Sequence, residues 1–168
     1  MPEIRDATEA DLPAILAIFN EAIRNTTAVW HTQEMTLEAR RAWMLERQGR
    51  GLPVLVAVED GIVRGFGSYG DFRPFSGYAQ TVEHSVYVDP AAQGRGIGRT
   101  LLAALMARAE AAGLHVMVGG IEAGNEASIR LHRAVGFTEA GVLRQVGRKF
   151  DRWLDLLFMQ KILGAAEK

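Results

Sequence analysis

The residues whose types and spacing could do chemistry are concentrated at positions 81–99, TVEHSVYVDPAAQGRGIGR. A glycine-rich turn, Gln93–Gly98, precedes apolar residues that recur there at helical spacing. Glycines permit positive φ angles and let a ligand approach the main chain, because no Cβ stands in the way. Backbone N–H groups at a helix N-terminus suit an anion, and Arg95 and Arg99 add positive charge. The turn is therefore a candidate phosphate-binding site.

Two well-known phosphate-binding patterns do not describe this turn. The dinucleotide pattern G-x-G-x-x-G, started at Gly94, fails because its sixth position is Arg99. The pattern G-x-x-x-x-G-K-[ST] fails because the lysine is absent. Taken alone, the turn is also compatible with a simple connection between a strand and a helix.

The strand before the turn, 81–88, carries a second candidate group, the carboxyl of Glu83. Its β-branched and aromatic residues predict a strand, whose side chains alternate between two faces. One face holds Val82, His84, Val86 and Val88, and the other holds Thr81, Glu83, Ser85 and Tyr87. Burial would raise the pKa of this carboxyl and suit it to act as a general base. The alternative is a glutamate that faces solvent or pairs with an arginine.

Two loops contain further candidates for binding. In the loop 71–80, Arg73 stands among three aromatic residues and could clamp a carboxylate, since a guanidinium pairs bidentately with one. The alternative is a solvated arginine between buried rings. In the polar segment 25–36, Trp30 is either a plug for the core or a ligand contact, because loops carry binding residues more often than their length suggests.

A predicted helix over 125–135 places four side chains in one stripe. These residues are Asn125, Ser128, Ile129 and His132. Asn125 and His132 would lie about 10 Å apart along the axis, a separation that suits two points on one extended ligand. His132 could donate a proton at neutral pH, or it could be a histidine of the core. With no cysteine nucleophile and no Ser-His-Asp order, direct attack is favoured over a covalent intermediate.

Seven strands and four helices are expected to position these groups. The strands are predicted at 4–7, 53–59, 62–69, 81–88, 114–121, 137–146 and 154–162, and the helices at 12–25, 37–48, 97–112 and 125–135. Asp60-Gly61 predicts a tight hairpin turn, and the basic stretch 147–152 separates the last two strands. This order predicts a single α/β domain over 1–168 with a mixed sheet and a frayed tail at 164–168.

Composition limits the classes of function. The chain has 168 residues, a net charge of −1 and no cysteine. The mixed charges give little support for a nucleic-acid partner, and the lack of thiols excludes a disulfide framework and agrees with a reducing cytoplasm. The start of the chain has no apolar signal core, and no apolar run approaches the roughly 18 residues of a membrane span. We therefore expect a soluble cytoplasmic protein without a resident metal.

Four blocks of the sequence resemble one known family. Gln93–Gly98 fits the Gln/Arg-x-x-Gly-x-Gly/Ala loop of the GNAT superfamily of N-acetyltransferases. The blocks at 83–88, 121–132 and 146–155, which read EHSVYV, IEAGNEASIRLH and VGRKFDRWLD, resemble its phosphinothricin and methionine sulfoximine N-acetyltransferase branch. The resemblance covers nearly the whole chain.

The resemblance implies a GNAT fold, with a mixed central sheet of six to seven strands flanked by four helices, and acetyl-CoA as the acyl donor. The loop amides would hold the pyrophosphate, and the main chain of the splayed central strand would hold the pantetheine arm and the thioester oxygen. The implied cofactor-binding residues are Val86, Tyr87, Val88, Gly94, Arg95, Gly96, Ile97, Gly98, Arg99 and Asn125.

The resemblance also implies roles on the acceptor side. Glu83 would take the proton from the amine, and His132, where many superfamily members have tyrosine, would protonate the leaving thiolate. The implied substrate-binding residues are Trp30, Arg73, Pro74, Phe75, Glu83, His84 and Ser85, although alternation puts His84 on the face opposite Glu83. The block 147–160 would contribute to a homodimer interface.

The function expected on this basis is transfer of acetyl to the α-amine of a small amino acid analogue, such as phosphinothricin or methionine sulfoximine or sulfone. One alternative keeps the chemistry but changes the acceptor to a protein N-terminus, a lysine or another amine. An alternative from another class is an acyl-CoA-binding sensor without turnover. The presence of both Glu83 and His132 argues against the sensor.

Overall fold

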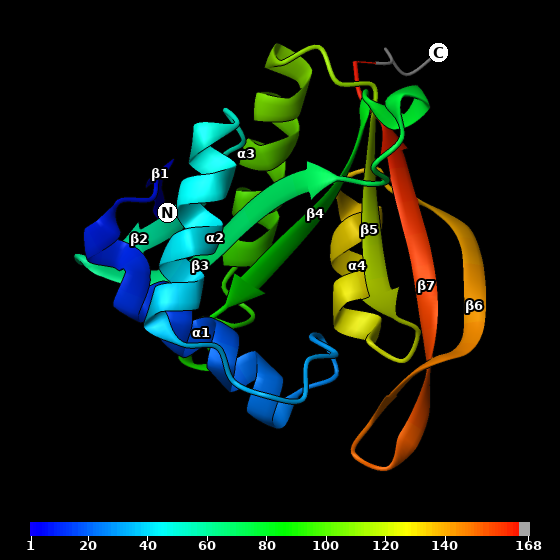
Figure 1. The fold of residues 1–168 in the computed structure, drawn as a ribbon, viewed down its shortest axis with the longest axis horizontal. Helices are drawn as coiled ribbons and strands as arrows, with labels where there is room; N and C mark the ends of the chain where they lie inside the picture. Colours follow the sequence, from blue (N-terminus) through cyan, green and yellow to red (C-terminus); the bar gives the residue numbers. More distant parts are fainter. Residues whose placement is uncertain (165–168) are drawn as a thin grey trace.

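The computed structural model describes residues 1–164 and arranges them as one seven-stranded sheet with helices on both faces (Figure 1). The strands are β1 (Glu3–Asp6), β2 (Val54–Glu59), β3 (Ile62–Asp71), β4 (Thr81–Val88), β5 (Val116–Glu122), β6 (Thr138–Lys149) and β7 (Arg152–Ile162). The helices are α1 (Leu12–Asn25), α2 (Leu37–Gly49), α3 (Ile97–Ala111) and α4 (Glu126–Ala134). Single 3-10 turns lie at Glu9–Asp11, Ser76–Tyr78 and Pro90–Ala92. The predicted mixed α/β sheet is confirmed, and the part of the predicted tail at 165–168 lies outside the described residues.

The strand order is β1-β2-β3-β4-β5-β7-β6, and every neighbouring pair is antiparallel except β4 and β5. That parallel pair is also the shortest contact in the interior of the sheet. It extends only from the pair Thr81–Val116 to the pair Glu83–Val118, after which the two strands diverge. The sheet is therefore open between the C-terminal half of β4 and β5, as Figure 1 shows.

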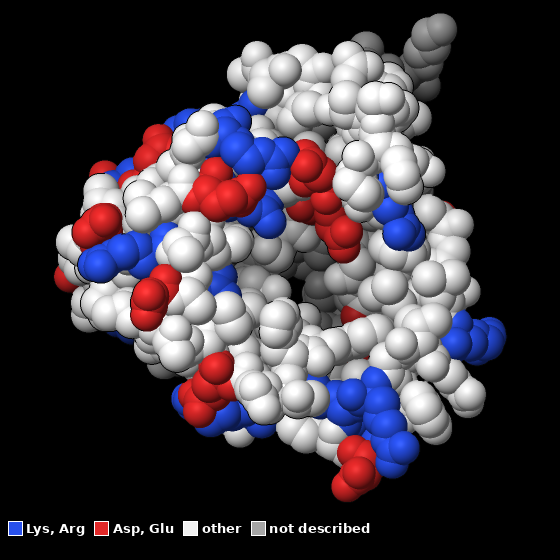
Figure 2. Space-filling model, in the orientation of Figure 1, with Lys and Arg blue, Asp and Glu red and all other residues white. Residues whose placement is uncertain are grey.

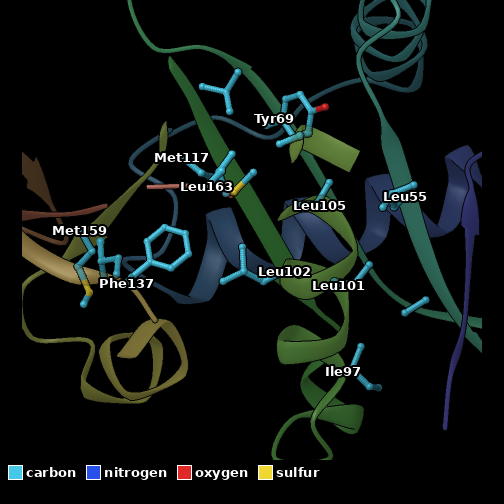
Figure 3. Packing of buried hydrophobic residues seen from close by; sticks show 14 of the residues in the cluster. Leu55, Tyr69, Ile97, Leu101, Leu102, Leu105, Met117, Phe137, Met159 and Leu163 are labelled. Atoms are coloured by element: carbon cyan, nitrogen blue, oxygen red, sulfur yellow. The ribbon is translucent and has the colours of Figure 1, made fainter. Parts of the chain in front are cut away.

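The two faces of the sheet carry separate cores. Alternation along β2 sends Val54 and Val56 to a cluster under α1 and α2, and Leu55 and Ala57 to a cluster under α3 and α4. The second cluster includes four residues of α3 that are essentially inaccessible to solvent, Ile97, Leu101, Leu102 and Leu105 (Figure 3). These spacings are the ones that the sequence pattern predicted for this helix.

Two close approaches explain glycines in β3. A Cβ at Gly65 would lie 2.9 Å from the carbonyl oxygen of Tyr87, and one at Gly67 would lie 3.0 Å from Leu105. The glycines thus let α3 and β4 pack tightly on β3. The turn at Asp60-Gly61 has φ angles of 52° and 74°, which confirms the predicted tight hairpin.

The last two strands differ from the prediction. We expected the stretch 147–152 to separate them, whereas β6 continues to Lys149 and β7 begins at Arg152. The turn consists of Phe150 and Asp151 alone, with φ angles of 50° and 57°. The sequence offered no glycine to mark these left-handed positions, so the boundary was misplaced. The β6–β7 hairpin consequently extends past the end of β5, because Glu122 of β5 already pairs with Leu156.

None of the helices within residues 1–164 is long and apolar enough to cross a membrane.

Candidate active site

The predicted site residues of β4 lie at the position where the sheet opens. Glu83 belongs to the last residue pair that joins β4 to β5, and residues 85–88 pair only with β3 on their other side. Main-chain groups of β4 that face β5 beyond this point therefore have no strand partner in the described part of the chain. Such groups are suited to a ligand that lies in the opening as an extra strand would.

Two features of the predicted phosphate turn fit a ligand with a diphosphate. Gly94 and Gly96 have φ angles of 74° and 83°, and a Cβ at either position would have no heavy atom within 4 Å. Gly96 is the N-cap residue of α3 and provides no side-chain cap, so the first N–H groups of the helix stay available. The turn lies on the exposed surface directly after β4, next to the opening in the sheet.

The side chain of Arg95 differs from our expectation that it adds charge for the anion. Its guanidinium lies 2.7 Å from Glu59, at the end of β2, and this carboxylate neutralises it. Arg99 is exposed and forms no ion pair with the described residues. The backbone of the turn, rather than Arg95, is therefore the main source of positive potential for an anion.

The environment of Glu83 suits a general base. The residue is only partly exposed, and burial raises the pKa of its carboxyl, while the positive charge of Arg73 acts in the opposite direction. A Cβ at Gly120 of β5 would lie 3.1 Å from Glu83 Oε1, so the absence of a side chain there keeps space for the carboxylate. The structure thus brings Glu83 and Arg73 together electrostatically at the opening between the strands.

The neighbours of Arg73 are more open than the sequence suggested. The guanidinium carbon lies 5.2 Å from the ring centroid of Phe72, and Arg73 itself is exposed. The alternative of a solvated arginine between buried rings is correct for the arginine, which is exposed, but wrong for the rings, since Phe75 is 69% exposed and Tyr78 is 43% exposed. Pro74 is exposed as well.

His84 and His132 form a buried pair on the other face of β4. Their rings stack with centroids 5.0 Å apart, and the two Nε2 atoms are 2.9 Å apart. His132 Nδ1 lies 2.7 Å from the carbonyl oxygen of Ser128, which can only accept, so this nitrogen carries a proton. In the neutral pair, His132 Nε2 must then accept the hydrogen bond that His84 Nε2 donates.

Burial keeps this pair neutral. It lowers the pKa of His84 to about 3, with a further contribution from His132, and it also lowers the pKa of His132. Both ring nitrogens of His132 are occupied, whereas His84 Nδ1 is buried without a partner in the described chain. A Cβ at Gly119 would lie 2.9 Å from each Nε2, which explains the glycine beside the pair. The expectation that His84 faces away from Glu83 is confirmed.

Asn125 and Trp30, two of the predicted site residues, make structural contacts. Asn125 caps α4, because its side-chain oxygen accepts a hydrogen bond from Ser128 N at 3.1 Å. The indole of Trp30 donates to the Thr27 carbonyl at 2.8 Å, and a Cβ at Gly147 would overlap with its ring. Trp30 thus joins the segment 26–35 to the β6–β7 hairpin.

Lys149 fastens the same segment, and sequence reasoning missed it. Its Nζ donates to the carbonyl oxygens of Thr26 and Val29 at 2.7 and 2.6 Å, and burial lowers its pKa. Because Lys149 stood within a basic stretch that we expected only to separate two strands, nothing in its neighbours marked it as a buried residue.

Sequence reasoning also missed Arg40 on α2. Its side chain is 4% exposed and lies against the aromatic rings of Phe19 and Trp43. A signal was present, because Arg40, Trp43, Met44 and Arg47 recur at the spacing of one helix face. An arginine at a position that the pattern assigns to the core needs either a partner or a function.

The surface between the α1–α2 layer and the β5–β7 side is hollowed (Figure 2). Residues 30–35 line a cavity of about 560 Å³ near it. Across the described residues there is no group of three or more His, Asp or Glu side chains that could hold a metal ion.

Comparison with known proteins identifies the family of this chain. The acetyltransferase (GNAT) family matches residues 15–137, which include the opened strand pair, the glycine turn and α4. The chain belongs to the GNAT family. An L-methionine sulfoximine/L-methionine sulfone acetyltransferase of Pseudomonas aeruginosa is 57% identical over 158 residues, which cover 94% of this chain and 92% of that protein.

Two solved GNAT structures have the same fold. A phosphinothricin acetyltransferase of Sinorhizobium meliloti in complex with acetyl-CoA superposes with a TM-score of 0.95 at 36% identity, covering 99% of this chain and 90% of that one. A ribosomal-protein-alanine N-acetyltransferase of Brucella melitensis is 58% identical, with a TM-score of 0.94 and coverage of 96% and 99%. The predicted GNAT fold is therefore confirmed.

Proposed function

We propose that this GNAT protein transfers acetyl from acetyl-CoA to the α-amine of a small amino acid analogue such as phosphinothricin or methionine sulfoximine or sulfone. The observation that carries the proposal is a carboxyl of raised pKa, Glu83, at the residue pair where β4 and β5 separate. The names of relatives that act on methionine sulfoximine, methionine sulfone and phosphinothricin support the acceptor class.

Acetyl-CoA supplies a thioester, whose carbonyl carbon an amine can attack. The turn residues Gly94–Arg99 bind the diphosphate through their N–H groups, and Asn125 contacts the donor from the start of α4. The main chain of residues 86–88 supports the pantetheine arm and donates an N–H to the thioester oxygen. A well-placed donor of this kind stabilises the oxyanion of the transition state by about 3 kcal/mol.

Glu83 prepares the acceptor. An α-amine with a pKa of about 8 is mostly protonated at neutral pH, so it must lose a proton before it attacks. Glu83 accepts that proton, and its raised pKa brings it closer to the ideal of a base matched to the working pH. Arg73 binds the acceptor carboxylate, while Pro74, Phe75, Ser85 and the Trp30 segment complete the acceptor pocket, with His84 behind it.

His132 is the proposed donor of a proton to the leaving thiolate. In the resting, neutral pair its Nε2 accepts from His84, so the pair must first take up one proton from water, which His132 Nε2 then passes to the thiolate sulfur. We therefore expect His132→Phe to lower kcat by about tenfold or more, as for loss of a general acid. An unchanged kcat across the pH range would remove this role.

The deciding experiment is a thiol-release assay with acetyl-CoA and a panel of acceptors. Phosphinothricin, methionine sulfone and methionine sulfoximine should be acetylated with higher kcat/KM than peptides that begin with alanine. The Brucella melitensis relative supports the second candidate, a protein N-terminus, and a reversed order would establish it instead. Bound CoA without thiol release from any amine would favour a sensor.

Variants in the same assay test the assigned roles. Glu83→Gln should lower turnover, whereas Arg73→Ala should mainly raise the KM of the amino acid. Equal activity in the wild type and in both variants would refute both assignments.

We also propose that the protein is a homodimer. Large apolar side chains are exposed on the β6–β7 hairpin, a feature that typifies an interface. They are Val142, Leu143, Val146, Phe150 and Trp153, with exposures of 44%, 46%, 53%, 54% and 59%. Light scattering that gives the mass of a single 18.4 kDa chain would refute the dimer. A cytoplasmic location and the lack of nucleic-acid or membrane partners stay predictions from composition.

A further inference from the structure

Arg40 is a buried cation without a counter-ion. Its guanidinium carbon lies 3.9 Å from the ring centroid of Phe19 and 4.5 Å from that of Trp43, and the residue is 4% exposed. Its Nε is buried without a hydrogen bond, and the guanidinium forms no salt bridge with a carboxylate within residues 1–164.

Arg47 adds a second cation on the same face of α2, seven residues later. Its Nη1 is also buried without a hydrogen bond in the described chain, and burial lowers its pKa. A Cβ at Gly70 would overlap with the Arg47 guanidinium, so this head group lies directly on β3. Gly70 is the residue of β3 that pairs with Glu83.

These charges persist at neutral pH. Burial lowers the pKa of Arg40 only to about 10, and the same effect raises the pKa of Tyr87, its polar neighbour, to about 12. Tyr87 is therefore a neutral hydroxyl and does not balance the charge. Cation–π contacts offset only part of the cost of burying an ion. A site that keeps such a cation unpaired is prepared for a ligand that brings electronegative oxygens.

The two arginines lie on the acceptor side of β4. Tyr87 shares a strand face with Ser85 and Glu83, and its ring contacts Phe19 at 5.3 Å between centroids. Glu83 and Tyr87 are four positions apart on the strand, a distance of about 13 Å along the backbone. Arg73 follows β3 at the opposite end, beyond the pair Asp71–Val82. Positive charge thus stands on both sides of Glu83.

We propose that Arg40, supported by Arg47, binds the oxygen-bearing end of the acceptor side chain, that is, a phosphinate, sulfone or sulfoximine group. This inference rests on the function proposed above. A guanidinium suits such groups because its N–H donors match paired oxygens. With the α-carboxylate at Arg73 and the amine near Glu83, the distal oxygens of a glutamate-sized acceptor point toward α2. Arg40 thus determines which amino acids are selected.

The test compares Arg40→Met with the wild type on three acceptors that differ at the distal end: phosphinothricin, methionine sulfone and methionine. The expected loss of kcat/KM is graded. It is largest for the anionic phosphinate, at about tenfold or more, smaller for the neutral sulfone and smallest for the thioether. The loss should lie in KM. Arg40→Lys keeps the charge but not the paired N–H donors of the guanidinium, so its loss of kcat/KM should be intermediate.

Arg41→Met is the matched control, because Arg41 is the neighbouring arginine on α2, is exposed and lies 3.5 Å from Glu9. It should leave the ratios among acceptors unchanged. Arg73→Ala should lower kcat/KM by a similar factor for all three acceptors, since all carry the α-carboxylate. The same uniform loss in Arg40→Met would assign Arg40 to that carboxylate or to the fold, and would overturn the proposal.

Thermal unfolding provides a readout that does not need turnover. Phosphinothricin should raise the Tm of the wild type but not that of Arg40→Met, and the Tm of unliganded Arg40→Met should equal or exceed that of the wild type, because an unpaired buried charge is removed. If the wild type acetylates all three acceptors and Arg40→Met leaves the ratios of kcat/KM among them unchanged, the role of Arg40 is refuted while the proposed function stands. A wild type that acetylates no amino acid refutes the proposed function, and the ligand-induced shift in Tm then decides whether Arg40 binds the oxygens.

Discussion

The two faces of β4 use polar residues in opposite ways. On the α3–α4 face, His84 and His132 bond to one another and to a main-chain carbonyl, and they stay neutral within an apolar core. On the α1–α2 face, Arg40 has no carboxylate partner in the described chain, and Arg47 has only Glu46, at 3.8 Å. Three of the four ring nitrogens of the histidine pair thus have internal partners, and only His84 Nδ1 has none, whereas on the other face Arg40 Nε and Arg47 Nη1 are left without partners in the described chain. Four changes test this contrast, in order of decreasing effect.

The largest effect is expected at Glu83. Replacing it by Gln removes the only carboxylate of that strand face, and kcat at neutral pH should fall by about 10²-fold. In the wild type, activity should fall as pH decreases through the raised pKa of Glu83, because the protonated carboxyl cannot accept a proton. Thiol release measures both. Glu126→Gln, at an exposed position of α4, is the control. Retention of half the wild-type kcat by Glu83→Gln would contradict the assignment.

The next effect concerns the packing of the histidine pair. In Gly119→Ala, the new Cβ would lie 2.9 Å from both Nε2 atoms, so one ring must move. We expect the free energy of unfolding in urea to fall by about 1–3 kcal/mol. Gly49→Ala, where a Cβ meets nothing within 4 Å, should be neutral or slightly stabilising. If both variants were equally stable, the two rings would not be held as tightly as described.

A third change tests the neutrality of the pair. The folded-state pKa of His84 lies near 3, below the unfolded value of about 6.5, so only the unfolded chain binds this proton between those values. Stability is therefore complete above about pH 6.5 and is lost as pH falls. His84→Gln keeps a donor for His132 but cannot titrate. Its unfolding free energy should lose about 1 kcal/mol less per pH unit between pH 6 and 5. Parallel curves would show that His84 is charged in the folded protein.

The smallest effect is expected from Lys149→Met. This change removes both hydrogen bonds to the carbonyls of Thr26 and Val29 and loosens the segment that contains Trp30. The KM of the amino acid should rise about threefold to tenfold, with little change in the KM of acetyl-CoA. Lys161→Met is the matched control, because Lys161 donates at 2.9 Å to the carbonyl of Val135, at the end of α4. A larger effect from Lys161 on acceptor binding would reverse the assignment of the faces.

Local patterns predicted much of this site. Two-residue alternation along β4 placed Glu83 and His84 on opposite faces, and glycine spacing located the turn before α3. Both depend only on the geometry of neighbouring residues, so a sequence can reveal them.

The missed residues depend on contacts between distant segments. Lys149 donates to carbonyl oxygens more than a hundred positions earlier in the sequence. The side chain of Arg40 is buried against one aromatic ring on α1 and another on its own helix. The pattern of α2 marked Arg40 as buried but could not indicate that no carboxylate would meet it. Arg95 was likewise expected to add charge for the anion. It pairs instead with Glu59, which belongs to the distant β2–β3 hairpin.

The brevity of the contact between β4 and β5 has a consequence for how the molecule can change over generations. Three residue pairs hold the strands together, and beyond them β4 presents peptide groups, which every amino acid possesses. Under the function proposed above, substitutions at 85–88 would change the side chains of this strand while the peptide groups assigned to acetyl-CoA stay the same. The proposed function therefore allows the preferred amine to change without a change in the peptide groups that bind the donor.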